Sequence, residues 1–198
     1  TIAAIHNTAM GGALELALGC HFRICSLDTQ IGLPEVKIGI FPGGTGTHRL
    51  PRLIGLKNAL KIIITGDPVG AEEAMELGIV DKIVTGNLLP EAIEFARYVI
   101  RTKKAFKKTC EPDGGLGCNA ESEAILNTFY KIANKKMVGQ IAPLKAIESI
   151  KQGLTTPFSK AVTNDTPVIA DLKSSAQSQA LRYAFFAERQ AAKVPGIT

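Results

Sequence analysis

Two glutamates near the start of the chain have neighbours that suit proton transfer. Glu15 lies within the apolar run 13–18, and Glu35 directly follows Pro34. Burial among aliphatic side chains penalises a charged carboxylate and raises its pKa, so that it can act as a general acid or base near neutral pH. The alternative is that Glu15 is an exposed residue of an amphipathic helix and that Glu35 only follows a rigid turn.

The two carboxylates can act together only if separate elements carry them. On one continuous helix, positions 15 and 35 would lie about 30 Å apart. The residues between them contain turns and a short strand, so the chain can fold back on itself. Two carboxylates that meet over one substrate form an acid/base pair.

A glycine pair, Gly11 and Gly12, precedes the helix expected to carry Glu15. Because glycine has no side chain, its backbone N–H can approach a ligand oxygen, and a helix N-terminus adds positive potential. The pair therefore predicts one half of an oxyanion hole. The alternative is that it only makes a tight turn from a strand into a helix.

Other common chemistries lack their residues. The segment Gly44-Thr45-Gly46 fits neither a dinucleotide fingerprint nor a phosphate-binding loop, and there is no Gly-x-Ser-x-Gly elbow. His48 lacks an obvious serine or cysteine partner, so we expect it at the surface beside Arg49. No metal site is expected, because the four cysteines are not spaced as metal ligands; they indicate reduced thiols in an intracellular setting.

Composition limits the class of protein. The 198 residues are 45% hydrophobic and 21% charged, which excludes a disordered or collagen-like chain. No apolar run approaches the roughly 18 residues of a membrane span. The net charge of +5 favours an anionic partner but is small for nucleic acid. Its main cluster is expected on the solvated flank of a helix: Lys103, Lys104, Lys107 and Lys108.

The elements that must position the glutamates are short and mixed. Strands are predicted over 2–5, 22–26 and 79–84, and helices over 13–18, 35–40, 47–64, 71–77 and 88–106. Residues 110–118 are rich in Gly and Pro and predict a linker. Beyond it, helices are predicted over 119–136 and 143–153 and from 159 onward, the last strongest over 168–192 after Pro167.

Three segments carry a family resemblance. They read IAAIHNTAMGGALELA (2–17), GLPEVKIGIFPG (32–43) and RLPRLIG (49–55), and in this order they resemble the enoyl-CoA hydratase/isomerase (crotonase) family. Weaker similarity continues to about residue 100. The segment QALRYAFFAER (179–189) looks like the linker that leads to the 3-hydroxyacyl-CoA dehydrogenase part of multifunctional β-oxidation enzymes of the peroxisomal type.

The resemblance implies roles for individual residues. Glu15 and Glu35 match the glutamates that handle the water and the α-carbon proton when a 2-enoyl-CoA is hydrated, and Glu35 alone would serve Δ3-to-Δ2 isomerisation. Gly12, beside Gly11, matches the N–H donor to the thioester oxygen, and Gly43 matches a loop glycine near the catalytic water. The substrate would be a CoA thioester. No cofactor or metal is implied in this segment, and NAD would bind only in the dehydrogenase part.

The resemblance also implies a fold and a domain organisation. We expect an α/β fold, with the C-terminal part of a crotonase-like (ββα superhelix) domain over 1–109, a linker over 110–118 and a helical connector toward a dehydrogenase domain over 119–198. The front part of the crotonase domain is expected to precede Thr1, so the chain alone would lack the second oxyanion donor. The full protein would be peroxisomal in a eukaryote and cytoplasmic in a bacterium.

The chain departs from the family pattern at four positions without losing either acid. Asn7, Ala13 and Thr45 stand where the family usually has Gly, and His21 replaces a common Asp. Two other functions stay open at this point. The chain could be an isomerase in which Glu15 is structural, or a non-catalytic interaction module whose functional part is the helical region.

Overall fold

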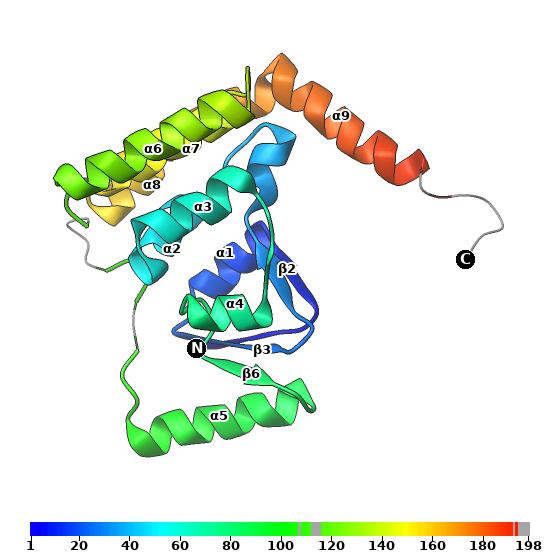
Figure 1. Cartoon of the computed structure of the whole chain (residues 1–198). Coiled ribbons are helices and arrows are strands. Elements are labelled where there is room, and N and C mark those ends of the chain that lie inside the picture. The colour runs from blue at the N-terminus through cyan, green and yellow to red at the C-terminus, as the bar shows by residue number, and fades with distance from the viewer. Residues whose placement is uncertain (107, 112–115, 192, 194–198) are drawn as a thin grey trace.

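The computed structural model describes residues 1–106, 108–111, 116–191 and 193, and it places a small mixed α/β body under a layer of long helices (Figure 1). The body extends from the N-terminus to the end of α5 (Leu88–Thr102). Across the described residues, no helix is both long and apolar enough to cross a membrane.

Two short sheets form the centre of the body. The first has the order β1-β3-β6, with β1 (Ile2–Ile5), β3 (Phe22–Ser26) and β6 (Lys82–Val84) all parallel. The second has the order β2-β4-β5, in which β2 (Thr8–Met10) is parallel to β4 (Gln30–Gly32), and β5 (Val69–Gly70) is antiparallel to β4. The chain therefore alternates between the sheets as it leaves β1 and β3.

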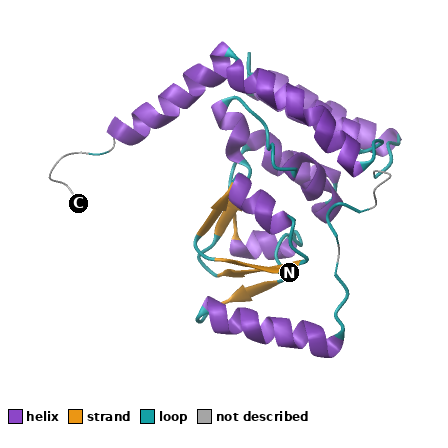
Figure 2. Cartoon of the chain, turned by 180° about the vertical axis from the view of Figure 1, so that it is seen from behind, coloured by secondary structure: helices purple, strands orange, loops and turns teal. Residues whose placement is uncertain are grey.

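Helices cover these sheets on two sides (Figure 2). On one side α5 packs against the first sheet, where the rings of Phe95 and Phe22 meet edge to face at 5.6 Å. The elements on the other side are α1 (Gly12–Leu18), the 3-10 helix η1 (Pro34–Ile38), α2 (Gly46–Ile54), α3 (Leu56–Thr65) and α4 (Ala71–Glu76). Gly55 separates α2 from α3. Its φ of 81° is a backbone conformation that few residues other than glycine adopt.

The helical region begins after the linker segment. It comprises α6 (Ala120–Lys136), α7 (Ala142–Gly153), α8 (Phe158–Ser174) and α9 (Ala176–Ala191). A capping box between Asn119 and Ser122 fixes the start of α6. Leu126, Ile147 and Leu172 join the same hydrophobic core as Leu60 of α3, so α6, α7 and α8 complete the core of the body. By contrast, α9 projects away from the body (Figure 1).

The predicted fold class, α/β followed by an all-helical region, is confirmed. The short strands β2, β4 and β5 were not predicted, because two or three residues are too few to show an alternating pattern. The predicted linker 110–118 and helix 168–192 include residues 112–115 and 192, which lie outside the described residues. The division of the chain into domains stays a prediction.

Two local expectations are wrong. The predicted helix 88–106 ends at Thr102, and Lys103 follows with φ of 50°, so Lys103 and Lys104 do not lie on a helix flank; Lys107 is outside the described residues. Pro167 does not precede the helix but lies inside α8. Pro167 is exposed there, as is Thr163 one turn earlier, so water can bond the carbonyl that proline leaves free.

Candidate active site

Glu15 lies on the inward face of α1 and is only 6% exposed, which excludes the exposed alternative. Its Oε1 accepts a hydrogen bond of 2.7 Å from the backbone N–H of Gly46. A Cβ at Gly44 would lie 2.6 Å from Oε2, so only glycine fits against this carboxylate. Burial raises the pKa of Glu15, and the N–H groups of Gly46 and Gly44 oppose that rise.

Glu35 lies in η1, which Pro34 begins. Its Oε1 faces Gly11, where a Cβ would be 3.1 Å away. Its Oε2 is buried, and no polar atom of the described residues hydrogen-bonds it. Burial, together with the negative charge of Glu15, raises the pKa of Glu35 to about 7, and the backbone N–H of Glu35 itself opposes the rise. A carboxyl group with that pKa can both give and take a proton near neutral pH.

The two carboxylates come from separate elements, α1 and η1, and lie near enough for the charge of Glu15 to contribute to the raised pKa of Glu35. That they share one acid/base site stays a prediction. The N–H of Gly11 donates to the carbonyl of Gly32 over 2.9 Å, which joins the start of α1 to the end of β4 just before η1. Each carboxylate thus lies against a glycine-containing turn. Their environments differ, since backbone donors hold Glu15 while Glu35 keeps a free buried oxygen.

The remaining predicted residues occupy two different places. Gly12 is the first residue of α1 and is exposed; a Cβ there would meet no atom within 4 Å. As the first N–H of the helix, its N–H has no acceptor within the helix. Gly43 faces Ile169 of α8, 3.1 Å from a Cβ at that position. The roles of Gly11, Gly12 and Gly43 in substrate binding stay predictions.

Sequence reasoning did not identify the residues that contact Glu15. Gly44 and Gly46 fit no nucleotide-binding pattern, yet both lie against the Glu15 carboxylate. Between them, Thr45 has φ of 87°, a backbone conformation that few residues other than glycine adopt. A Gly-x-Gly segment directly before a helix is the sequence signal that indicates this tight turn.

His48 is buried, so the prediction of a surface position is wrong. It is 1% exposed, and its Nε2 lies 2.8 Å from Oδ2 of Asp165 on α8. The physical reason is that α2 is covered on this side by α7 and α8, which the sequence does not place. Among the described residues, no group of three or more His, Cys, Asp or Glu side chains could hold a metal ion.

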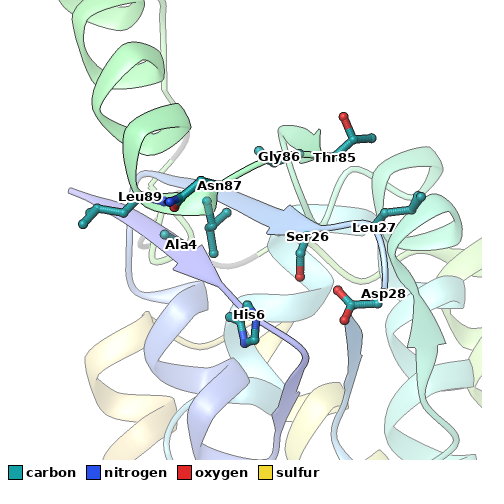
Figure 3. Close-up of a pocket in the computed structure, with 11 residues that line it drawn as sticks. Ala4, His6, Ser26, Leu27, Asp28, Thr85, Gly86, Asn87 and Leu89 are labelled. Atoms are coloured by element: carbon teal, nitrogen blue, oxygen red, sulfur yellow. The ribbon is translucent and has the colours of Figure 1, made fainter.

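A separate cavity of about 870 Å³ lies where β1, β3 and β6 end (Figure 3). His6, Ser26 and Asp28 line it together with the start of α5. A hydrogen bond from Ser26 lowers the pKa of Asp28, and His6 contributes to the lowering. Neither Glu15 nor Glu35 lines this cavity, so the two glutamates lie elsewhere in the body.

Comparison with known proteins identifies the family. The model of the enoyl-CoA hydratase/isomerase family matches residues 1–140. The chain belongs to this family. This match confirms the resemblance found in the sequence. It extends past the predicted boundary at residue 109 and includes the whole of α6.

Two curated relatives match nearly the whole chain. The peroxisomal bifunctional enzyme of Cavia porcellus is 40% identical over 196 residues, covering 97% of this chain and 26% of the relative. The fatty acid oxidation complex subunit alpha of Shewanella baltica is 39% identical over 199 residues, covering 98% and 28%. This chain therefore spans about a quarter of the length of these relatives.

A solved structure supports the fold. Carnitinyl-CoA hydratase from Mycobacterium avium superposes with a TM-score of 0.61 and 24% identity, over 95% of this chain and 60% of the other. At that identity the likeness shows a common fold and nothing finer. The crotonase-like α/β fold is thus confirmed for this member of the family.

Proposed function

We propose that the protein hydrates 2-enoyl-CoA thioesters to 3-hydroxyacyl-CoA in fatty-acid β-oxidation. The observation that carries this proposal is the pair of neighbouring carboxylates in different surroundings: Glu15 is buried and hydrogen-bonded by a backbone N–H, and the half-buried Glu35 has a buried oxygen without a hydrogen bond. Membership of the family and the names of the relatives support the substrate class. Isomerisation of a Δ3 to a Δ2 double bond is a second reaction of the same site.

The different surroundings of the two carboxylates favour different proton-transfer roles. Glu15, oriented by the N–H of Gly46, accepts a proton from water as the water oxygen bonds to the β-carbon. Glu35, with a pKa of about 7, delivers its proton to the α-carbon, and exchange with solvent then restores both groups. The N–H of Gly12, at the start of α1, stabilises the enolate-like thioester oxygen between these events.

The full-length protein supplies what this segment does not contain. We propose that residues preceding Thr1 provide the second oxyanion donor and much of the CoA site. A covalently linked 3-hydroxyacyl-CoA dehydrogenase part would use NAD, whereas the hydration step needs no cofactor. We propose a peroxisomal location in a eukaryote, which the name of the Cavia porcellus relative supports, and a cytoplasmic one in a bacterium.

Substitution of the two carboxylates in the full-length protein tests this function. Glu15→Gln and Glu35→Gln should each abolish hydration of crotonyl-CoA, followed by the loss of enoyl-thioester absorbance. Glu76→Gln, at an exposed position of α4, is the matched control and should hydrate at the parent rate. Parent turnover in both carboxylate variants would overturn the proposal.

An isomerase without hydratase activity is the second candidate. It is favoured by the free oxygen of Glu35 and by the two N–H groups that would make Glu15 structural. Isomerisation of a Δ3-enoyl-CoA that survives Glu15→Gln but is lost in Glu35→Gln, in a parent that does not hydrate crotonyl-CoA, would support it. A non-catalytic interaction module is excluded if CoA thioesters raise the melting temperature of the full-length protein.

A further inference from the structure

A buried polar cluster joins the helical region to the start of α2. At its centre is Asp165 of α8, which is 7% exposed. Its Oδ2 lies 2.8 Å from Nε2 of His48, 2.7 Å from Oγ of Ser149 and 3.3 Å from Oγ1 of Thr47. A single carboxylate oxygen therefore accepts hydrogen bonds from α2 and α7 at once, which offsets the cost of burying it.

The ring of His48 is fixed within this cluster. Its side chain is fully buried, and a Cβ at Gly153 of α7 would lie 2.4 Å from its Nδ1. The ring thus fills the space that the glycine leaves, while its Nε2 points at Asp165. The steric contact on one side and the hydrogen bond on the other hold the His48 ring in a single orientation.

The cluster directly adjoins the turn that holds Glu15. Thr47 and His48 are the next residues after Gly46, whose N–H bonds the Glu15 carboxylate. Thr45, just before, has φ of 87°, a strained conformation that costs on the order of 1–3 kcal/mol and persists only where neighbouring contacts enforce it. One such contact is the 2.7 Å hydrogen bond from Arg49 Nε to Thr45 Oγ1. The backbone N–H groups of His48 and Arg49 also donate to the Thr45 carbonyl, and the bonds from Thr47 and His48 to Asp165 hold the residues that follow.

We propose that Asp165 is a positioning residue for Glu15. It holds the first turn of α2 so that the N–H groups of Gly44 and Gly46 stay aimed at the Glu15 carboxylate. The kinetic consequence of this inference rests on the proposed hydration reaction. The helical region then takes part in the site as well as completing the core, because α8 fixes a turn that contacts a reacting group.

The kinetic test uses the full-length protein with crotonyl-CoA. Asp165→Asn keeps the size of the side chain but weakens its hydrogen bonds, because a neutral amide oxygen is a poorer acceptor than a carboxylate. We expect kcat for hydration to fall by roughly 10- to 100-fold, since misplacing a reacting group by about 1 Å can cost that much, with KM nearly unchanged. Asp171→Asn, at an exposed position of the same helix, is the matched control and should keep the parent kcat.

A second measurement is independent of catalysis. In Asp165→Asn, hydrogen exchange of the Gly46 amide should accelerate by about tenfold or more, as expected when its bond to Glu15 is lost. The Ile63 amide in α3 should keep its parent exchange rate, and Asp171→Asn should change neither amide. If the parent protein shows no hydration, the proposed function fails while this exchange measurement still decides the positioning role.

Two results would overturn the inference. One is a Gly46 amide that exchanges equally in Asp165→Asn and Asp171→Asn. The other is an acceleration shared equally by Gly46 and Ile63, which would mean that Asp165 only stabilises the fold. If Asp165→Asn fails to fold, Ser149→Ala removes one of the three donors and gives the same comparison with a smaller perturbation.

Discussion

The raised pKa of Glu35 predicts that removing its charge stabilises the protein in a pH-dependent way. In the folded state the pKa is about 7, against 4.5 for the free side chain. The folded state therefore binds the proton more tightly, and its stability falls as the pH rises through the window from 4.5 to 7. At 1.36 kcal/mol per pKa unit, the full penalty above pH 7 is about 3 kcal/mol.

Glu35→Gln removes this penalty. Relative to the parent, the variant should gain about 3 kcal/mol in free energy of unfolding at pH 8. At pH 5 it should gain less than about 1 kcal/mol, because the folded parent is protonated there and the pH is only just above the unfolded-state pKa of 4.5. The cost of leaving a buried amide without partners reduces both gains by the same amount, so it cancels from the difference between the two pH values. The gain in free energy of unfolding at pH 8 should therefore exceed the gain at pH 5 by about 2 kcal/mol or more.

Urea unfolding of the full-length parent and variant, followed by a probe in the first sheet, measures this difference. Glu76→Gln, on the exposed face of α4, provides the control and should show no such dependence on pH. An equal effect of Glu35→Gln at pH 5 and pH 8 would refute the reasoning, because the Glu35 carboxyl would then pay no desolvation penalty in the folded state.

Two further predictions concern contacts to the site. Gly44→Ala would place a Cβ 2.6 Å from Oε2 of Glu15, so it should destabilise the protein by about 1–3 kcal/mol in thermal unfolding and lower kcat for crotonyl-CoA hydration; Gly86→Ala, where a Cβ meets nothing within 4 Å, should do neither. Ser178→Ala would remove the 2.9 Å hydrogen bond from the fully buried Ser178 to the carbonyl of Ile38 at the end of η1. It should cost about 1 kcal/mol of stability, whereas parent-like unfolding would show that α9 does not brace η1.

The two candidate glutamates could be found in the sequence because their signals are local. A glutamate inside an apolar run is conspicuous, and so is one that follows a proline at a turn; both proved to be on short helical elements. The glycine pair before α1 is equally visible. Asn7, which stands where the family usually has Gly, has φ of 61°, a backbone conformation that Asn adopts more readily than most residues.

The partners of these residues could not be predicted, because they come from distant parts of the chain. The hydrogen bond between His48 and Asp165 spans 117 positions, and that between Ser178 and Ile38 spans 140. Neither a local pattern nor a spacing indicates such contacts, which depend on how α8 and α9 pack on α2 and η1. The same limit explains why His48, flanked by a basic residue, was expected at the surface.

Cooperation between Glu15 and Glu35 in one reaction is the central claim, and a double-variant comparison tests it most directly. Rates of crotonyl-CoA hydration would be measured for the full-length parent, Glu15→Gln, Glu35→Gln and the double variant. Groups that act as a unit lose nearly all their effect when either is removed, so the double variant should be no slower than the slower single variant. Losses that multiply in the double variant, or a parent rate in either single variant, would contradict a shared acid/base site.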